Sequence, residues 1–320
     1  MAFHDCDRGE LCFLCHISVD DLGMIVGVKM HADEVDIDES LVRRLVAGQF
    51  PEWVGLPIEL VASSGTDNAM FRLGTDLAVR MPRMTGAAKD VAAEQKWVPL
   101  LAPHLPVAVP TPVACGEPAE GYPYQWTVCR WLPGTNPAVD DLASPEQLAR
   151  DLGAFIVALR CVDPVDAPPA GRGVPLATRD KSTRAAIAAS DGLIDTAAVT
   201  AVWQDAMRIP AWSGRPAWTH ADLSPGNLLV RDGRLAAVID WGIAGVGDPT
   251  VDLIVAWNLL PVSARLAFRE VLAADDDTWH RGRGWALSIS LIQLPYYQHT
   301  NPALAANSRH VIAEILADAG

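Results

Sequence analysis

The sequence has no surplus of positive charge. Its 25 Lys and Arg residues are outnumbered by 39 Asp and Glu, which gives a formal net charge of −14 at pH 7. Proteins that bind nucleic acid usually carry a basic patch or stripe, so we expect no nucleic-acid partner. The acidity suits a cationic small molecule, but it suits an ordinary soluble protein as well, because net charge bears first on solubility and association.

Long apolar runs are missing too. No stretch of about 18 apolar residues is present, so we expect no membrane span, and the charged residues between His4 and Glu10 do not resemble a signal peptide. The six cysteines form no regular framework, which fits a reducing compartment. The sequence therefore predicts a cytoplasmic protein that is either a monomer or a homodimer.

Residues 1–34 differ from the rest of the chain. Cys12 to His16 match the C-x-x-C-H pattern of haem attachment, but that chemistry needs an oxidising compartment and no export signal accompanies it. We therefore interpret the segment as a poorly ordered N-terminal extension, with Met24 and Met30 as alternative starts. Haem or metal binding is the alternative interpretation.

The remaining chain begins with a β-rich part. Half of all residues are hydrophobic, which allows a sizeable packed core, and a chain of this length commonly folds as two units. We predict an α+β fold. Alternating apolar residues and turn signals predict strands over 58–62, 69–73, 77–81 and 125–131, and helical periodicity predicts helices over 38–50 and 87–101.

After Pro133 the pattern is mostly helical. Apolar residues lie at helical spacing within 145–160, and residues 163–178 are rich in Pro, Gly and Ala, which predicts a loop. Asp232-Gly233 favours a hairpin turn between two short strands. These strands are predicted over 227–230 and 236–239, and further helices over 182–190, 196–206, 250–260, 263–273, 283–294 and 303–317.

One ordered set of residues predicts chemistry. The run His220-Ala221-Asp222-Leu223-Ser224-Pro225-Gly226-Asn227 precedes the hairpin, and Ile239-Asp240-Trp241-Gly242 follows it. Phosphoryl transfer needs a carboxylate beside the attacking hydroxyl and oxygen ligands for Mg²⁺ that hold the β- and γ-phosphates. Asp222 can supply the first. Asn227 and Asp240, which the hairpin can bring side by side, can supply the second.

This set resembles the aminoglycoside phosphotransferase family. The loop reads His-x-Asp-x-x-x-x-Asn without the Arg that follows His in protein kinases, and Asp-Trp-Gly stands where protein kinases have Asp-Phe-Gly. The run Gly247-Asp248-Pro249-x-x-Asp252-Leu253 comes soon after. Members of the family share a two-lobed protein-kinase-like fold and phosphorylate small hydroxylated molecules. The resemblance covers roughly residues 35–320.

The resemblance implies a division of labour between two lobes. A small β-rich N-lobe over 35–132 would bind the nucleotide, and a larger, mostly helical C-lobe over 133–320 would hold the catalytic loop and the acceptor site. ATP or GTP would donate the phosphate, with Mg²⁺ as cofactor. In the N-lobe, the hinge around Cys129 to Leu132 would contact the adenine.

The resemblance also implies roles within the catalytic loop. Asp222 would be the base, or the group that orients the attacking hydroxyl. Asn227 and Asp240 would be the metal ligands. His220 and Asp252 are expected to be structural and to brace the loop.

A polar loop of the N-lobe is the candidate phosphate-covering loop. Ser63 to Asn68 lie between two predicted strands, where the family has that loop, and backbone N–H groups and small hydroxyls there can meet phosphate oxygens. The candidate residues are Ser64, Gly65, Thr66 and Asn68. The alternative is an ordinary hairpin loop.

Arg80 stands in the strand where kinases carry a phosphate-binding Lys. Glu94 lies on the same helical stripe as Val91 and Val98 and so faces inward, and an inward carboxylate needs a partner. We predict that Arg80 and Glu94 form a pair beside the nucleotide phosphates. Arg83 is a competing cation, and the alternative is that both partners lie at the surface.

The acceptor is not determined by the sequence. Acidic residues could bind a cationic acceptor, and aromatic residues could stack on a sugar, but an acidic run is usually a solvated turn and buried aromatics are usually core. The acidic candidates are Glu270, Asp275, Asp276 and Asp277, and the aromatic candidates are Trp257, Trp279, Trp285, Tyr296 and Tyr297.

The function predicted on this basis is a Mg²⁺-dependent phosphotransferase that acts on a hydroxyl of a small molecule. An aminoglycoside acceptor would imply antibiotic resistance. Macrolides, sugars and choline-like or homoserine-like alcohols remain alternatives, because relatives of this fold act on all of them. A second alternative, an inactive nucleotide-binding pseudokinase, is motivated by Arg80 in place of Lys.

Overall fold

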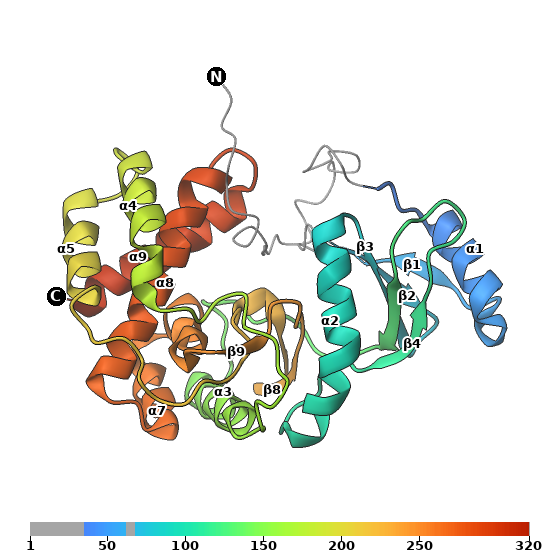
Figure 1. The fold of residues 1–320 in the computed structure, drawn as a ribbon, viewed down its shortest axis with the longest axis horizontal. Coiled ribbons are helices and arrows are strands. Elements are labelled where there is room, and N and C mark those ends of the chain that lie inside the picture. Colours follow the sequence, from blue (N-terminus) through green and yellow to red (C-terminus); the bar gives the residue numbers. More distant parts are fainter. Residues whose placement is uncertain (1–34, 62–67, 320) are drawn as a thin grey trace.

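The chain folds into a small β-rich lobe and a larger helical lobe (Figure 1). A computed structural model describes residues 35–61 and 68–319. Two separate clusters of buried apolar side chains form the cores, one centred on the sheet and one on the helices. No helix within the described ranges is both long and apolar enough to cross a membrane.

The small lobe is built on a five-stranded antiparallel sheet with the strand order β1-β2-β3-β5-β4. Side chains of β2 alternate, with Ala69, Phe71 and Leu73 buried, whereas β3 is buried along most of its length because it lies at the centre of the sheet. The strands are β1 (Ile58–Leu60), β2 (Asn68–Leu73), β3 (Leu77–Pro82), β4 (Pro112–Gly116) and β5 (Trp126–Arg130).

Two helices accompany this sheet. Asp38 caps α1 (Glu39–Gln49) by accepting a hydrogen bond from the Leu41 backbone N–H at 2.7 Å. Helix α2 (Thr85–Leu101) stands on the side of the sheet that faces the larger lobe (Figure 1). Val98 and Leu101, near its C-terminal end, already belong to the core of the larger lobe, so α2 connects the two cores.

The larger lobe is helical, with α3 packed on α7 and α8 packed on α9 and α4. Short 3₁₀ turns precede α4 and α6. The helices are α3 (Pro145–Arg160), α4 (Asp180–Ala189), α5 (Thr196–Ala206), α6 (Val255–Asn258), α7 (Val262–Leu272), α8 (Asp276–Tyr297) and α9 (Pro302–Ala319).

Two small β-ladders carry the loops that matter for function. Strand β6 (Ala217–Thr219) pairs with β9 (Gly245–Gly247), and β7 (Leu228–Arg231) pairs with β8 (Arg234–Val238). Asp232 and Gly233 both have positive φ, +53° and +73°, as a tight two-residue hairpin turn requires. This hairpin brings its two ends together, as the sequence predicts.

Some elements differ from the sequence prediction. Helix α8 begins at Asp276, not near 283, because Asp275 accepts a hydrogen bond from the Thr278 N–H at 2.8 Å and two acidic residues occupy the first turn. The predicted helix over 250–260 begins as a 3₁₀ turn, Pro249–Ile254. The short strands β4, β6 and β9 were not predicted, since three to five residues carry little periodic signal.

The loop over 161–175 is held against β9 by backbone hydrogen bonds. The N–H of Val246 donates to Pro168 O at 2.8 Å, and the N–H of Ala170 donates to Val246 O at 3.1 Å. Gly171 N–H donates to Ile243 O at 2.9 Å. These bonds fix the backbone on the N-terminal side of Arg172, whose side chain points to the site described below.

Replacing Gly245 by Ala should destabilise this arrangement. The added Cβ would lie 2.5 Å from Ala170 N and 2.7 Å from Pro168 O, and backbone atoms cannot move aside cheaply. We expect a loss of about 1–3 kcal/mol in the free energy of unfolding, measured by urea titration. Gly86→Ala is the control, because a Cβ there meets nothing within 4 Å; equal stability of the two variants would contradict this packing.

Candidate active site

The loop from His220 to Asn227 connects β6 to β7, and hydrogen bonds to the Asp252 side chain hold its first two residues in place. The Asp252 carboxylate accepts hydrogen bonds from the backbone N–H groups of His220, at 3.0 Å, and Ala221, at 2.8 Å. Ala221 has a φ of +67°, a strained conformation for a residue with a Cβ. Burial raises the pKa of Asp252 to about 6, while these backbone donors and Arg160 oppose the rise. The bracing role predicted for Asp252 fits this geometry.

His220 is fully buried and also serves the loop. Its Nδ1 accepts a hydrogen bond from the Asp222 N–H at 3.3 Å, which leaves Nε2 to donate to Ile239 O at 3.0 Å. Burial lowers the pKa of His220 to about 4, and the bond to Ile239 only partly offsets it. A neutral imidazole therefore ties the loop to the end of β8.

Asp222 and Asn227 face one another across the loop. The Asn227 side-chain amide donates to the Asp222 backbone O and to Oδ2 of its carboxylate, both at 2.9 Å. The backbone O of Asn227 accepts from the Ile239 N–H at 2.9 Å, so the residue before Asp240 is bonded directly to Asn227. The hairpin thus brings Asn227 and Asp240 together.

Arg80 links the small lobe to Asp240, which lies just beyond the end of β8. Its Nη1 pairs with Glu94 of α2, and its Nη2 donates to Asp240 Oδ1 at 3.0 Å. Glu94 in turn accepts from the Trp241 N–H at 2.6 Å. When the side-chain O and N of Asn68 are exchanged, the Asn68 amide oxygen accepts from Arg80 Nε at 3.3 Å and from Arg80 Nη2 at 3.0 Å. The predicted Arg80–Glu94 pair is present, and Arg80 extends it to Asp240.

The electrostatics of Asp240 follow from this setting. Burial raises its pKa to about 7; the Arg80 guanidinium lowers it, and the nearby carboxylates of Glu94 and Asp222 raise it. Asp240, two residues beyond the end of β8, also adopts a positive φ of +64°. Such strain persists where surrounding structure enforces it, commonly at functional sites.

Arg172 is a site residue that the sequence analysis missed. Its guanidinium forms an ion pair with Asp222 Oδ1 and donates to Ala221 O at 3.2 Å. Both side chains are buried. Burial raises the pKa of Asp222, and Arg172 opposes that rise. The Pro/Gly-rich segment around Arg172 has no periodicity, and fifty residues separate it from Asp222, so no local pattern could have predicted the contact.

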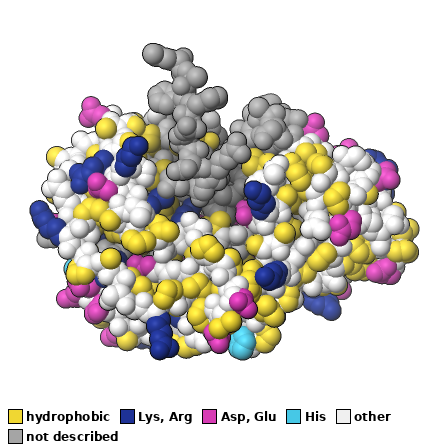
Figure 2. Space-filling model, in the orientation of Figure 1, with side chains coloured by type: hydrophobic (Ala, Val, Ile, Leu, Met, Phe, Trp, Pro, Cys, Tyr) yellow, Lys and Arg dark blue, Asp and Glu magenta, His cyan; other side chains and the backbone are white. Residues whose placement is uncertain are grey.

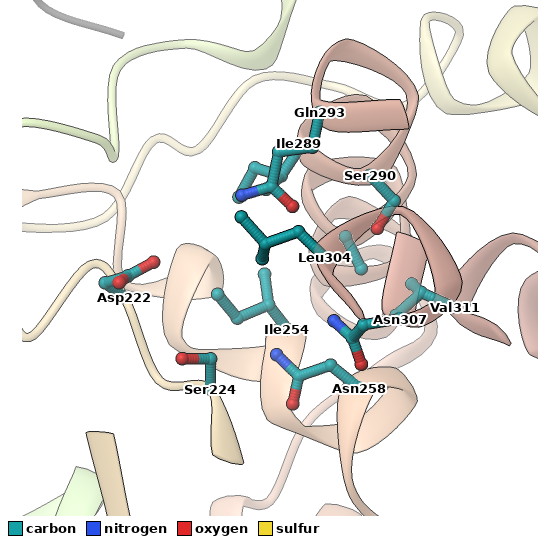
Figure 3. Close-up of a pocket in the computed structure, with 11 residues that line it drawn as sticks. Asp222, Ser224, Ile254, Asn258, Ile289, Ser290, Gln293, Leu304, Asn307 and Val311 are labelled. Carbon is teal, nitrogen blue, oxygen red and sulfur yellow. The ribbon is translucent and has the colours of Figure 1, made fainter. Parts of the chain in front are cut away.

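A pocket opens beside Asp222 and runs toward α8 and α9 (Figure 3). Its empty volume, including the part open to solvent, is about 410 Å³. Asp222 and Ser224 come from the catalytic loop, Asn258 closes the end of α6, and Ile289 and Asn307 come from α8 and α9. The pocket therefore extends from Asp222, the proposed base, into the helical lobe.

The acidic candidates for the acceptor site lie elsewhere. All four are exposed around the α7–α8 connection, where Asp275 caps α8 and Asp276 pairs with Arg269. None of them lines the pocket at Asp222 within the described part of the chain. The acidic run is therefore a solvent-exposed helix start, and the pocket at Asp222 gives no support for its candidate role in acceptor binding.

The aromatic candidates also have other roles. Trp257, Trp279 and Trp285 are buried in the core of the helical lobe, where Trp257 and Trp279 pack with ring centroids 4.8 Å apart. Tyr296 and Tyr297 pack against each other at the end of α8. As far as the structure describes the chain, the pocket is lined by none of these five residues.

Two predicted contacts of the nucleotide remain open. Ser64, Gly65 and Thr66 lie outside the described residues, whereas Asn68 begins β2 and contacts Arg80. The hinge around Cys129 to Leu132 begins in the last two residues of β5 and continues past its end, where the Trp131 N–H donates to Asp76 O at 2.8 Å. The nucleotide contacts of both segments stay predictions.

The sequence profile of the phosphotransferase enzyme family matches residues 60–285, a span that includes the catalytic loop, Arg80 and Arg172. The chain belongs to this family. The predicted resemblance is thereby confirmed, and the family identifies the chain as a phosphotransferase. Its profile ends inside α8, so part of the pocket wall lies beyond it.

Individual relatives agree with this membership. An aminoglycoside 3'-phosphotransferase of Escherichia coli is 41% identical over 59 residues, which cover 18% of this chain and 22% of that protein. The chain therefore matches only about a fifth of that relative's length. The match is a local one, and substrate does not follow from it.

Solved structures of phosphotransferases share the fold. The GDP complex of wild-type aminoglycoside 2'-phosphotransferase-IIIa superposes with a TM-score of 0.70 at 19% identity, covering 89% of this chain and 100% of that one. The macrolide 2'-phosphotransferase MphH from Brachybacterium faecium gives a TM-score of 0.59 at 24% identity, covering 86% and 97%. These likenesses confirm the predicted α+β, protein-kinase-like fold.

Replacing Arg172 by Gln should change the pH dependence of the reaction. Without the guanidinium, the pKa of the buried Asp222 carboxyl rises further, so the carboxylate form is lost at a higher pH. We expect the acid limb of the rate–pH profile, measured as nucleoside diphosphate formation, to move to higher pH. Arg172→Lys keeps the positive charge and should leave the limb near its wild-type position. An unmoved limb in Arg172→Gln would contradict this role.

Proposed function

We propose that the chain is a Mg²⁺-dependent kinase that transfers the γ-phosphate of ATP or GTP to a hydroxyl of a small molecule. One observation carries the proposal: the buried Asp222 carboxylate borders a pocket on one side and contacts Asn227, the neighbour of Asp240, on the other. Family membership supports phosphoryl transfer as the reaction. Relatives of the same fold were solved in complexes with GDP and ADP, which supports a nucleotide donor.

In the proposed reaction, the acceptor hydroxyl lies in the pocket within reach of Asp222. The acceptor oxygen bonds to the γ-phosphorus as the bond from that phosphorus to the bridging oxygen breaks, which releases a nucleoside diphosphate. The hydroxyl proton passes to the Asp222 carboxylate. Because such transition states are largely dissociative, we expect orientation of the hydroxyl to contribute as much as removal of its proton.

Asn227 and Asp240 are the residues that would hold Mg²⁺. Mg²⁺ is commonly bound through one or two carboxylates together with substrate phosphates and waters, and a carboxylate with a neighbouring amide oxygen fits that set. When bound, the ion would neutralise charge on the β- and γ-phosphates. Within residues 35–61 and 68–319, no group of three or more His, Cys, Asp or Glu residues is arranged to hold a metal ion.

Arg80 would contact the nucleotide phosphates, and Glu94 would hold the Arg80 guanidinium in position beside them. Arg keeps the charge of the usual Lys and adds a planar fork that can bind two acceptors at once, as Arg80 does with Glu94 and Asp240. An inactive pseudokinase is the second candidate because of this substitution. We favour the enzyme because Asp222, Asn227 and Asp240 are all present, and Asn227 bonds both to Asp222 and to Ile239, the residue before Asp240.

Asp222→Asn should cut kcat by at least about 10²-fold while leaving nucleotide binding intact, because the amide cannot accept the hydroxyl proton. Steady-state rates and calorimetric titration with nucleotide would measure the two effects. Asp232→Asn is the matched control, since Asp232 is an exposed hairpin residue whose positive φ suits Asn. Near-normal turnover of Asp222→Asn would remove Asp222 from the mechanism.

Asp240→Ala should abolish Mg²⁺-dependent nucleotide binding or turnover, because the proposed carboxylate ligand is lost. Binding and rate would be measured across a Mg²⁺ titration. The exposed Asp191 beyond α4 offers a control, Asp191→Ala. If the Mg²⁺ dependence of Asp240→Ala matched that of the control, Asp240 would not be a metal ligand.

A further inference from the structure

The pocket beside Asp222 contains little net charge. Among the described residues that line it, only Asp222 has an ionisable side chain, and that carboxylate is already paired with the buried Arg172. The opposite charges largely cancel at a distance of a few ångströms. An acceptor with several ammonium groups would lose hydration in this pocket without gaining carboxylate partners.

Two polar atoms of the pocket residues have no hydrogen-bond partner among the described residues. Asn258 Nδ2 donates to Leu223 O at 2.9 Å, which fixes the amide, and its Oδ1 is buried with no hydrogen bond to any described residue. The Ser224 hydroxyl is in the same state. Buried polar atoms are rarely left unpaired in proteins. Both residues line the pocket, so a ligand hydroxyl could complete both atoms.

The remaining polar side chains are neutral. Ser290, Gln293 and Asn307 line the pocket from α8 and α9, and amides and hydroxyls can both donate to and accept from a ligand hydroxyl. Figure 3 shows Asn307 facing Asn258, with Asp222 and Ser224 across the pocket. Hydrogen-bonding groups therefore surround the space from two sides.

The space between these groups is apolar. Ile254 and Leu304 lie between Asp222 and Asn307 (Figure 3), and Ile289 and Val311 extend the aliphatic lining. Ile289 is only partly buried by the protein, so a ligand could cover the rest of its side chain. Apolar surface removed from water in this way favours a ligand that has an apolar face of its own.

We propose that the acceptor is a hydroxylated molecule with an apolar face and at most one positive charge. Hydroxylated molecules that carry several ammonium groups are then poor acceptors. This inference rests on the proposed kinase function. The reacting hydroxyl would lie at Asp222, a second hydroxyl would meet Asn258 and Ser224, and the apolar face would cover Ile254 and Ile289. Chemically, such an acceptor is an alkyl glycoside or a sugar-bearing macrocycle.

The test compares hydroxylated acceptors that differ in charge. With saturating Mg²⁺ and nucleotide, kcat/KM would be measured for octyl glucoside and erythromycin, which have no or one amino group, and for kanamycin, which has several. We expect the best low-charge acceptor to exceed kanamycin by at least about tenfold. Kanamycin as the equal or better substrate would overturn the inference while leaving the proposed function intact.

Variants of the pocket residues test whether the acceptor binds in this pocket. Asn258→Leu should raise KM for the best acceptor by at least about tenfold, and Ile289→Trp, which fills the pocket, should do the same, with KM for the nucleotide unchanged. Gln147→Leu on the exposed face of α3 is the control. An unchanged acceptor KM in both pocket variants would overturn the assignment of this pocket.

Nucleotide binding without phosphorylation of any acceptor would contradict the proposed kinase function but would not test the inference about the pocket. If no acceptor is phosphorylated although Mg²⁺ and nucleotide bind, the kinase proposal fails. Calorimetric titration of the Mg²⁺–nucleotide complex with kanamycin and octyl glucoside then tests the pocket. Kanamycin binding tighter than about 1 mM that Ile289→Trp abolishes would overturn the charge inference, and octyl glucoside binding with the same sensitivity would support it.

Discussion

Three carboxyl groups lie close together at the junction of the two lobes, and two arginines from distant segments hold them there. Glu94 and Asp222 are buried and Asp240 is partly buried. A buried carboxylate that loses its partner typically costs a protein about 3–5 kcal/mol. Arg80 pairs with Glu94 and Asp240, and Arg172 pairs with Asp222. The positions of β3, α2, the catalytic loop and the 161–175 loop are therefore constrained by one shared need for charge compensation.

The rest of the site follows from that constraint. Asp252 holds the catalytic loop from the helical side, and His220 ties it to the end of β8. Asp222 meets Asn227 through Oδ2 and Arg172 through Oδ1, and it lines the pocket that runs toward α8 and α9. The charged groups thus gather on the side proposed for nucleotide and metal, while the pocket itself is neutral. In the proposed reaction, this separation would let one carboxylate serve a strongly charged donor and an acceptor of low charge.

The sequence predicted the features that depend on local patterns. Periodicity located α3 and the strands β2 and β3, and the inward stripe of α2 predicted that Glu94 would meet Arg80. The Asp232-Gly233 turn explained how Asn227 comes to lie beside Asp240. Arg172 could not be predicted, because its contact with Asp222 depends on how an irregular loop packs on β9. The acidic run at 275–277 was ambiguous, since the same residues suit a helix start and a cation site.

The central claim is that the chain transfers a phosphoryl group to an acceptor hydroxyl. The most direct measurement follows a radiolabel in the γ-phosphate while the enzyme turns over Mg²⁺ and nucleotide with its best low-charge acceptor. We predict that the label appears in a phosphomonoester of the acceptor, in step with the nucleoside diphosphate formed. Label that stays in the nucleotide, or that appears only as free phosphate, would contradict it.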